Sequence, residues 1–297
     1  MKQIKILLLA VFAFTALTIQ AEVLLVENFD YTTGSTLLEA NSDWFHYWPN
    51  HDNTMLITDG GLSFAGYAGS DIGNALVIEG DHTSDEPYHK FTTVTEGDVF
   101  AAFMLKPTYV IKNGYVLTFC EENIGNFNNC GRVFLDYDYF EADDAYHPII
   151  GSRVFKESVT YADELPLDEN KTYLVVLRYR IVADGLNEVS LYLFDEMPTK
   201  LPSKPLIGPL TNNNAPDICP AHVGFHTWNS SYGEDGEVTV DGLRIATNFY
   251  EALGIDEPTD IDQAETATSR HFTTKLINGT IVITNGISTY NLLGTKL

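Results

Sequence analysis

Residues 172–182 read TYLVVLRYRIV, and the alternation of apolar and polar side chains in this stretch decides the fold class. In an extended strand successive side chains point to opposite faces, so every second residue shares a face. Five apolar side chains therefore share one face here, those of Tyr173, Val175, Leu177, Tyr179 and Ile181. Arg178 and Arg180 fall on the opposite face, which predicts a half-buried strand.

The same period of two recurs along the chain. It places apolar residues on one face of residues 97–105 (GDVFAAFML), 132–140 (RVFLDYDYF) and 187–194 (NEVSLYLF). Clusters of Gly, Asn, Asp and Pro separate such runs, and no stretch has the clear periodicity of an amphipathic helix. Many short strands joined by such turns predict an all-β protein, a two-sheet antiparallel sandwich of the jelly-roll type.

The chain is expected to consist of a large domain and a small C-terminal segment. The last strand of the domain lies in EVTVDGLRIATNFYEA, so we expect the sandwich to cover residues 22–254. Residues 255–270 are polar and aperiodic, which is typical of a linker. Residues 271–297 contain Asn-Gly pairs at 278–279 and 285–286, which favour hairpins. This segment is predicted to be a small β appendage, too small to be stable without a partner.

The N-terminus has the order of a secretory signal peptide, which we assign to residues 1–21. Lys2 and Lys5 precede an apolar run that ends near the small residue Ala21. We therefore expect the mature chain to begin near Glu22 and to be secreted or displayed at the cell surface. No later segment approaches the ~20 apolar residues of a membrane span, so none is expected.

The charge of the chain narrows the class of partner. The formal net charge is −24 at pH 7. A surface this acidic repels nucleic acid, and it repels anionic polysaccharide unless cations screen it. No nucleic-acid partner is therefore expected, and the plain interpretation of the charge is solubility outside the cell.

The cysteines suggest one disulfide. Cys120 and Cys130 flank nine residues between two apolar runs, where a hairpin would bring its stems together. An exported protein meets oxidising conditions, so we expect a bridge between these two residues. The alternative is a pair of unpaired thiols. Cys219 is then left over and is interpreted as a small buried apolar residue.

Four phrases of the sequence resemble exported bacterial domains with the concanavalin A-like lectin/glucanase (LamG-like) jelly-roll fold. They are VENFDYTTG at 26–34, GGLSFAGYAGSDIGNALVI at 60–78, DVFAAFML at 98–105 and VDGLRIATNF at 240–249. The resemblance covers roughly residues 22–250. It implies the fold more than the function, because these motifs are strands and turns.

The end of the chain is similar to a shortened C-terminal sorting domain of the type IX secretion system of gram-negative bacteria. The matching residues are Tyr290-Asn291-Leu292-Leu293-Gly294. This resemblance implies the secretion machinery as a partner. The alternative is a C-terminal hairpin packed on the sandwich.

No catalytic residues are predicted. Glucanases among the fold relatives carry Glu-x-Asp-x-Glu or Glu-x-Asp-x-x-Glu on one strand, so that two carboxylates flank the scissile bond. This chain has Glu-x-Asp at Glu79/Asp81, Glu96/Asp98 and Glu141/Asp143, and each lacks the second glutamate. An acid pair that the fold brings together from distant segments stays an alternative.

No metal site or cofactor is predicted either, although two sets of residues could offer oxygen ligands to a structural calcium ion. The first is the acidic run at 136–144, whose plain interpretation is a solvated strand end. The second is Glu27 with Asp241, because the first and last strands of jelly rolls often neighbour each other. His222 and His226 lie four residues apart, but in a stretch that alternates like a strand, so the helical zinc spacing does not apply.

Aromatic residues supply the candidate ligand contacts. Residues 43–53 (DWFHYWPNHDN) contain Trp44, which we assign to the core, and Trp48, which precedes a proline and a polar loop. Trp48 and Trp228 are predicted to face outward and to stack on sugar rings, the alternative being ordinary packing.

These observations predict an exported, non-catalytic β-sandwich module that binds an extracellular ligand, either carbohydrate or a cell-surface partner. A glycan-active hydrolase or lyase on the same fold is one alternative. A purely structural surface or matrix protein is another.

Overall fold

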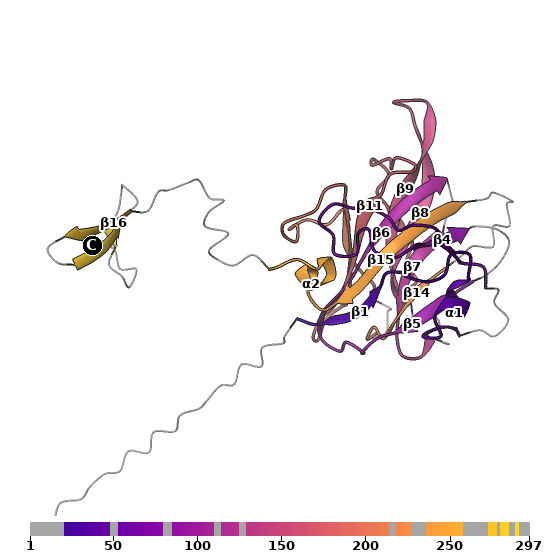
Figure 1. Cartoon of the computed structure of the whole chain (residues 1–297), viewed down its shortest axis with the longest axis horizontal. Helices are drawn as coiled ribbons and strands as arrows, with labels where there is room; N and C mark the ends of the chain where they lie inside the picture. The colour runs from indigo at the N-terminus through magenta and orange to yellow at the C-terminus, as the bar shows by residue number, and fades with distance from the viewer. Residues whose placement is uncertain are drawn as a thin grey trace, which may run out of the picture. The chain divides into compact units, whose positions relative to one another are not determined.

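The computed structural model describes residues 21–47, 53–79, 85–109, 114–124, 129–213, 218–226 and 236–257, together with three strands nearer the C-terminus. Two antiparallel sheets form a β-sandwich, as the alternation of the sequence predicts (Figure 1). Within these residues no helix is long and apolar enough to cross a membrane.

The first sheet has eight strands and is called sheet A here. Its order is β13-β12-β11-β6-β15-β4-β3, and β1 also pairs with β15. The strands are β1 (Val23–Glu27), β3 (Leu56–Thr58), β4 (Ala75–Glu79), β6 (Gly97–Tyr109), β11 (Tyr173–Ile181), β12 (Glu188–Phe194), β13 (Ile207–Thr211) and β15 (Glu237–Ala246). The first and last strands of the domain are thus neighbours, with Glu27 opposite Leu243.

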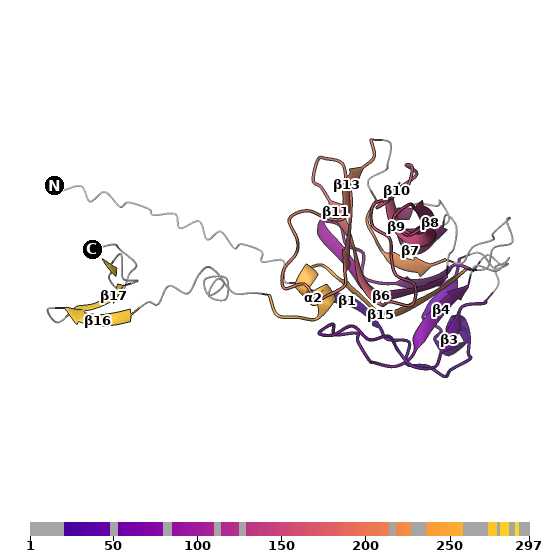
Figure 2. The same ribbon diagram turned by 90° about the horizontal axis from the view of Figure 1, so that it is seen from above.

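The second sheet has seven strands and is called sheet B. Its order is β10-β9-β8-β7-β14-β5-β2. The strands are β2 (Trp44–His46), β5 (Pro87–Lys90), β7 (Gly114–Cys120), β8 (Asn129–Phe140), β9 (Ala145–Val154), β10 (Thr160–Tyr161) and β14 (His222–Phe225). Figure 2 shows β7, β8 and β9 as a layer facing β6, β15 and β4 of sheet A.

The main core lies between the two sheets. The alternating residues predicted to be buried in β6 and β11 are in it, among them Phe103, Leu105 and Leu177. Trp44 is also in this core, where its ring stacks on Phe225 with the centroids 5.4 Å apart. The assignment of Trp44 to the core is therefore confirmed.

A second apolar cluster covers the other face of sheet A. The short helix α2 (Phe249–Leu253) follows β15 and packs Phe249 against Phe100 of β6. Asn248 begins the helix by accepting a hydrogen bond from the backbone of Tyr250, and Gly254 ends it with a φ of 67°. The other helix, α1 (Leu37–Ala40), is one turn long. Both helices are short because the sequence has no sustained 3.6-residue period.

The structure contradicts the predicted disulfide between Cys120 and Cys130, because both thiols are free. The register shifts between Phe119 and Cys120, so that Cys120 lies opposite Asn129. Cys130 then joins the core between the sheets, whereas Cys120 packs with other residues on the outer face of sheet B. Neighbouring residues of a strand point to opposite faces, so this register separates the two thiols.

The C-terminal segment is a unit of its own. Contacts along the chain divide it into residues 1–255 and 256–297. The second unit contains a three-stranded antiparallel sheet of β16 (Thr273–Ile277), β17 (Thr280–Thr284) and β18 (Thr289–Tyr290).

Candidate functional site

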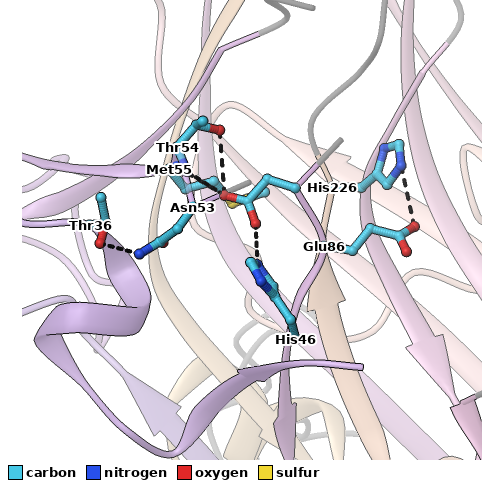
Figure 3. Close-up of polar contacts among 8 residues, drawn as sticks. Thr36, His46, Asn53, Thr54, Met55, Glu86 and His226 are labelled. Carbon is cyan, nitrogen blue, oxygen red and sulfur yellow. Dashed lines mark hydrogen bonds and ion pairs between the residues drawn. The ribbon is translucent and has the colours of Figure 1, made fainter. Parts of the chain in front are cut away.

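The start of β5 is where two other strands of sheet B end. β5 pairs with β2 on one side, where Pro87 lies opposite His46, and with β14 on the other. Both neighbours are antiparallel to β5, so they run in the same direction and end at the same edge of the sheet. His46 ends β2 and His226 directly follows β14, so both lie beside Asp85 and Glu86 (Figure 3).

Asp85 organises one side of this edge. Its carboxylate is fully buried and lies 2.5 Å from Nε2 of His46. It also accepts hydrogen bonds from the backbone N–H groups of Thr54 (2.7 Å) and Met55 (3.2 Å). These contacts tie the segment before β3 to the end of β2. Asp85 is therefore a positioning residue whose oxygens are already engaged.

The side chain of Glu86 points to the face opposite that of Asp85, since consecutive residues of an extended chain point to opposite faces. Its side chain is 12% exposed, and its Oε1 lies 3.2 Å from Nε2 of His226, whose side chain is 18% exposed. The hydroxyl of Tyr115, from β7, donates a hydrogen bond to the same oxygen. The Glu86 carboxylate thus holds an imidazole and a phenol together.

Ring contacts complete this group. The rings of Tyr115 and His226 stack with their centroids 4.1 Å apart and an interplanar angle of 21°. The guanidinium of Arg132, from β8, lies 4.9 Å from the centroid of the Tyr115 ring. Burial, followed by the charge of Glu86, raises the pKa of Tyr115 well above its usual value. The phenol is therefore a hydrogen-bond donor at any working pH.

A glycine shapes the outer face of sheet B next to this group. A Cβ at Gly224 of β14 would lie 2.6 Å from Cδ1 of Tyr88, closer than carbon atoms approach. The Tyr88 ring therefore lies directly on the backbone of β14. Because glycine has no side chain, the aromatic ring of Tyr88 can cover the backbone of β14 at this position.

Glu86, Tyr115, Arg132 and His226, called the sheet B cluster below, combine an acceptor with several donors. An ionised carboxylate accepts hydrogen bonds, a guanidinium donates them, and an imidazole does either. Such a set suits a ligand with many hydroxyl groups. The phenol and imidazole, both bound to one carboxylate, are also groups that transfer protons in enzymes.

The residues predicted to bind a ligand lie next to this cluster in the sequence. Trp48 and Trp228 are both outside the described residues. Each follows a described histidine by two positions, Trp48 after His46 and Trp228 after His226. Their predicted roles thus stay predictions.

The sheet B cluster itself was missed by sequence reasoning. Its members are the residue before β5, one residue each of β7 and β8, and the residue after β14, so no spacing within one motif connects them. His226 drew attention only for its distance from His222, and Glu86 has no signal beyond the proline after it. The order of the strands in the sheet determines which residues meet in the cluster. The alternation of apolar and polar residues does not specify that order.

The predicted neighbourhood of Glu27 and Asp241 is observed in the structure. Asp241 is fully buried and accepts hydrogen bonds from the backbone of Leu62 (2.7 Å) and Gly242 (2.6 Å). Burial, together with the charge of Glu27, raises the pKa of Asp241 to about 7. The oxygens of Glu27 accept hydrogen bonds from three donors, namely the backbone of Phe29, the Tyr31 hydroxyl and Nε1 of Trp44.

The surroundings of Asp241 fit a hard cation. A Cβ at Gly61 would lie 2.8 Å from Oδ2 of Asp241 and within 3.3 Å of the carbonyl oxygens of Ile72 and Gly73. In the residue after Glu27, Oδ1 of Asn28 is buried, and no described group forms a hydrogen bond with it. Calcium takes several such oxygens. Asp241 and Glu27 would hold it, and the ion would offset the charge that these carboxylates bring into the fold.

The acidic run at 136–144 does not converge on one point. Asp143 lies 2.6 Å from Nε2 of His147, Asp144 accepts a hydrogen bond from the Tyr139 hydroxyl, and Asp138 accepts one from the backbone of Tyr139. In the part of the chain that the structure describes, no group of three or more His, Cys, Asp and Glu side chains is placed to share an ion.

No family model and no curated protein matches this chain. Solved structures do resemble it. A variant of alginate lyase Aly36B in complex with alginate tetrasaccharide superposes with a TM-score of 0.48 at 11% identity, over 76% of this chain and 96% of that protein. The endo-β-1,4-glucuronan lyase from the fungus Trichoderma reesei gives a TM-score of 0.42 at 10% identity, over 74% and 96%.

A third similar structure is domain 4 of AbnA, an extracellular GH43 arabinanase from Geobacillus stearothermophilus, in complex with arabinotriose. Its TM-score is 0.36 at 13% identity, over 76% of this chain and 92% of that one. At such identities the likeness is one of fold.

Proposed function

We propose that this protein is an exported, non-catalytic module that binds carbohydrate at the outer face of sheet B. The observation that carries the proposal is the contact of one partly exposed carboxylate, Glu86, with both His226 and Tyr115. Carboxylate, imidazole and guanidinium groups form the hydrogen bonds that fix sugar hydroxyls in a chosen orientation. Stacked rings beside them hold these groups in place.

The predicted sugar-stacking tryptophans complete the proposal. Trp48 and Trp228 come two residues after His46 and His226, which flank the start of β5. Polar groups that orient a ligand and aromatic faces that cover it are the two components of a small-ligand site. We assign the polar component to Glu86, His226 and Arg132, and the aromatic component to the two tryptophans.

Binding without hydrolysis is favoured by the state of Asp85. Hydrolysis of a glycosidic bond by the common route needs two carboxyl groups facing the bond from a short distance. Asp85 is the carboxylate next to Glu86 in the sequence, but it is buried, points the other way and already binds His46 and two backbone N–H groups. Glu86 thus lacks Asp85 as a partner.

A second candidate is a glycan-cleaving enzyme that works by proton transfer. The stacked Tyr115 and His226, both bound to Glu86, are the observation that favours it. In such an enzyme His226 would take a proton and the Tyr115 hydroxyl would supply one.

The test measures binding and turnover on the same glycans. Purified protein is titrated with a panel of soluble oligosaccharides, and product formation is followed in parallel. We expect binding without turnover, and a loss of affinity of about tenfold or more in Glu86→Gln and His226→Gln, because each removes hydrogen bonds to the ligand.

A matched control separates the site from the surface charge. Glu122 is an exposed carboxylate that pairs with Lys90, so Glu122→Gln should bind as the wild type does. Binding that is unchanged in Glu86→Gln and His226→Gln would contradict the proposal. Turnover that Tyr115→Phe abolishes would establish the enzyme instead.

A further inference from the structure

The tip of the β8–β9 hairpin extends beyond the sandwich. Among the residues that the structure describes, β7 pairs with β8 as far as Leu135, which lies opposite Gly114. Beyond that point β8 and β9 pair with each other, through pairs such as Tyr139 with Tyr146. Figure 1 shows this hairpin projecting from the body of the sandwich. Its tip therefore exposes both of its faces.

One face of this tip continues the core side of the sheet. Val133 and Leu135 are in the core between the sheets, and Tyr137 and Tyr139 follow them at the same period of two. Tyr146 lies opposite Tyr139 on the neighbouring strand. The side that sheet A covers in the body is uncovered at the tip. Tyr146 is 62% exposed and Tyr139 is 43% exposed.

The three tyrosines form a fixed arrangement, called the hairpin patch below. The ring of Tyr146 meets the edges of Tyr137 and Tyr139, each with the centroids 5.4 Å apart. The interplanar angles are 79° and 62°, the edge-to-face geometry that aromatic pairs prefer. The Tyr139 hydroxyl also donates to the Asp144 carboxylate. Because these contacts already orient the rings, a ligand that stacks on them loses little entropy.

The charge around the hairpin patch disfavours anionic ligands. The segment between Arg132 and Arg153 contains no lysine and no arginine, whereas it contains five carboxylates, those of Asp136, Asp138, Glu141, Asp143 and Asp144. An anionic chain is repelled here. A neutral sugar chain instead offers C–H groups to the ring faces and hydroxyls to the carboxylates.

We propose that the hairpin patch is a separate binding surface for an uncharged polysaccharide chain, with Tyr146 as the central stacking residue. It shares with the proposed function only the class of ligand, because the patch and the sheet B cluster have no residue in common. The two surfaces can thus be tested one at a time.

The experiment compares variants in a titration with neutral hexasaccharides of β-linked glucose, xylose and mannose, a polyuronate hexasaccharide and a lysine-rich peptide. We expect at least one neutral hexasaccharide to bind. Tyr146→Ala should lose affinity by about tenfold or more, and Tyr146→Phe, which keeps the ring, should lose about threefold or less.

Leu186→Ala is the control. Leu186 is 41% exposed and lies just before β12, far from the tip of the hairpin. In β12, Val189 lies where a Cβ at Gly131 would meet it at 3.2 Å, and Gly131 is near the start of β8, the end away from the tip. This variant should bind as the wild type does. Thermal melts of all three variants verify that each is folded.

Three results would overturn the inference: unchanged affinity in Tyr146→Ala, binding of the lysine-rich peptide alone, or a concentration-dependent dimer that Tyr146→Ala abolishes. The fates of the two proposals differ. Loss of affinity in Tyr146→Ala but not in Glu86→Gln supports the hairpin patch and contradicts the sheet B cluster. The reverse pattern contradicts the hairpin patch alone.

Discussion

The imidazole of His226 lies flat against the phenol of Tyr115, with the ring centroids 4.1 Å apart, and both groups bind the carboxylate of Glu86. The three residues come from the end of β14, from β7 and from the residue before β5. One carboxylate thus joins three strands of sheet B. The stability of this part of the sheet should therefore depend on the charge of Glu86.

Glu86→Gln should destabilise the domain as well as weaken ligand binding. The amide loses the negative charge that accepts a hydrogen bond from Tyr115 and lies 3.2 Å from Nε2 of His226. A weakened buried hydrogen bond to a charged group costs roughly 1–3 kcal/mol. Urea unfolding measures the change. Glu122→Gln, at an exposed site, should leave the unfolding midpoint where it is in the wild type. An equal midpoint for Glu86→Gln would show that Glu86 contributes nothing to the fold.

Trp44→Ala should reduce the free energy of unfolding by about 3–5 kcal/mol, the usual cost of removing a large core side chain. It leaves a cavity beside Phe225 and removes the donor that lies 3.0 Å from Oε2 of Glu27. Trp44→Phe keeps a ring and loses only the donor, so its melting temperature should fall between those of the wild type and Trp44→Ala. A melting temperature of Trp44→Ala equal to that of the wild type would contradict the core assignment.

The stability of the domain should depend on the ionisation of Asp241. Burial raises the pKa of this carboxyl to about 7, whereas an unfolded aspartate titrates near 3.9. Between about pH 4 and pH 7 the folded state holds a proton that the unfolded state has lost, so stability falls as the pH rises through this window.

Asp241→Asn cannot ionise and provides the comparison. In a buffer with a chelator, the free energy of unfolding of the wild type minus that of Asp241→Asn should be larger at pH 5 than at pH 8, by roughly 2–3 kcal/mol. A constant difference would show that the carboxyl of Asp241 keeps an ordinary pKa.

If the ionised carboxylates of Asp241 and Glu27 hold a calcium ion, calcium should stabilise the wild type at pH 8. Thermal melts with calcium and with chelator measure this effect. Asp241→Asn removes one charged ligand, so its melting temperature should respond far less. A melting temperature of the wild type that is the same in both buffers would exclude a structural calcium ion here.

The cysteines should react as free thiols. Burial raises the pKa of Cys120 to about 12 and that of Cys130 well above its usual value, so both thiols stay protonated and unreactive in the folded protein. Thiol titration should count both residues after unfolding without a reductant. Mass mapping that finds them linked would contradict the free thiols of the structure.

Deleting residues 256–297 should leave the sandwich folded, because the chain divides into two units after Ile255. The truncated protein should melt cooperatively at a temperature close to that of the whole chain. If the tail is a sorting signal, its loss should change where the protein is delivered, which fractionation of the producing cells measures. A large fall in the melting temperature would instead support a hairpin that packs on the sandwich.

The fold was predictable because the alternation of apolar residues is a local property. The period of two in residues 97–105 and 172–182 identified core-facing side chains such as Phe103 and Leu177, and these are buried. The disulfide between Cys120 and Cys130 was instead predicted from their places on either side of a hairpin loop, and that prediction was wrong. A register shift between Phe119 and Cys120 changes which residues face each other, and nothing in the sequence of the two strands marks it.

The candidate site was less predictable, because it depends on contacts between distant segments. Glu86 and His226 are 3.2 Å apart only because β14 pairs with β5. Glu27 and Asp241 were predicted to be neighbours because the first and last strands of jelly rolls often lie side by side. The pairing of β1 with β15 supports that argument. A general rule about strand order thus predicted this pair, whereas predicting the sheet B cluster requires the complete strand order of the sheet.

Because the β8–β9 tip lies outside the packed core, ligand recognition and stability of the domain can change separately there, although mutations usually change both together. Among the described residues, those at 138–147 have ladder partners only among one another, so substitutions there should leave the cooperative core intact. Selection can then alter what the tip recognises while the melting behaviour of the domain stays constant. A library of sequences displayed on this tip would for the same reason share one scaffold.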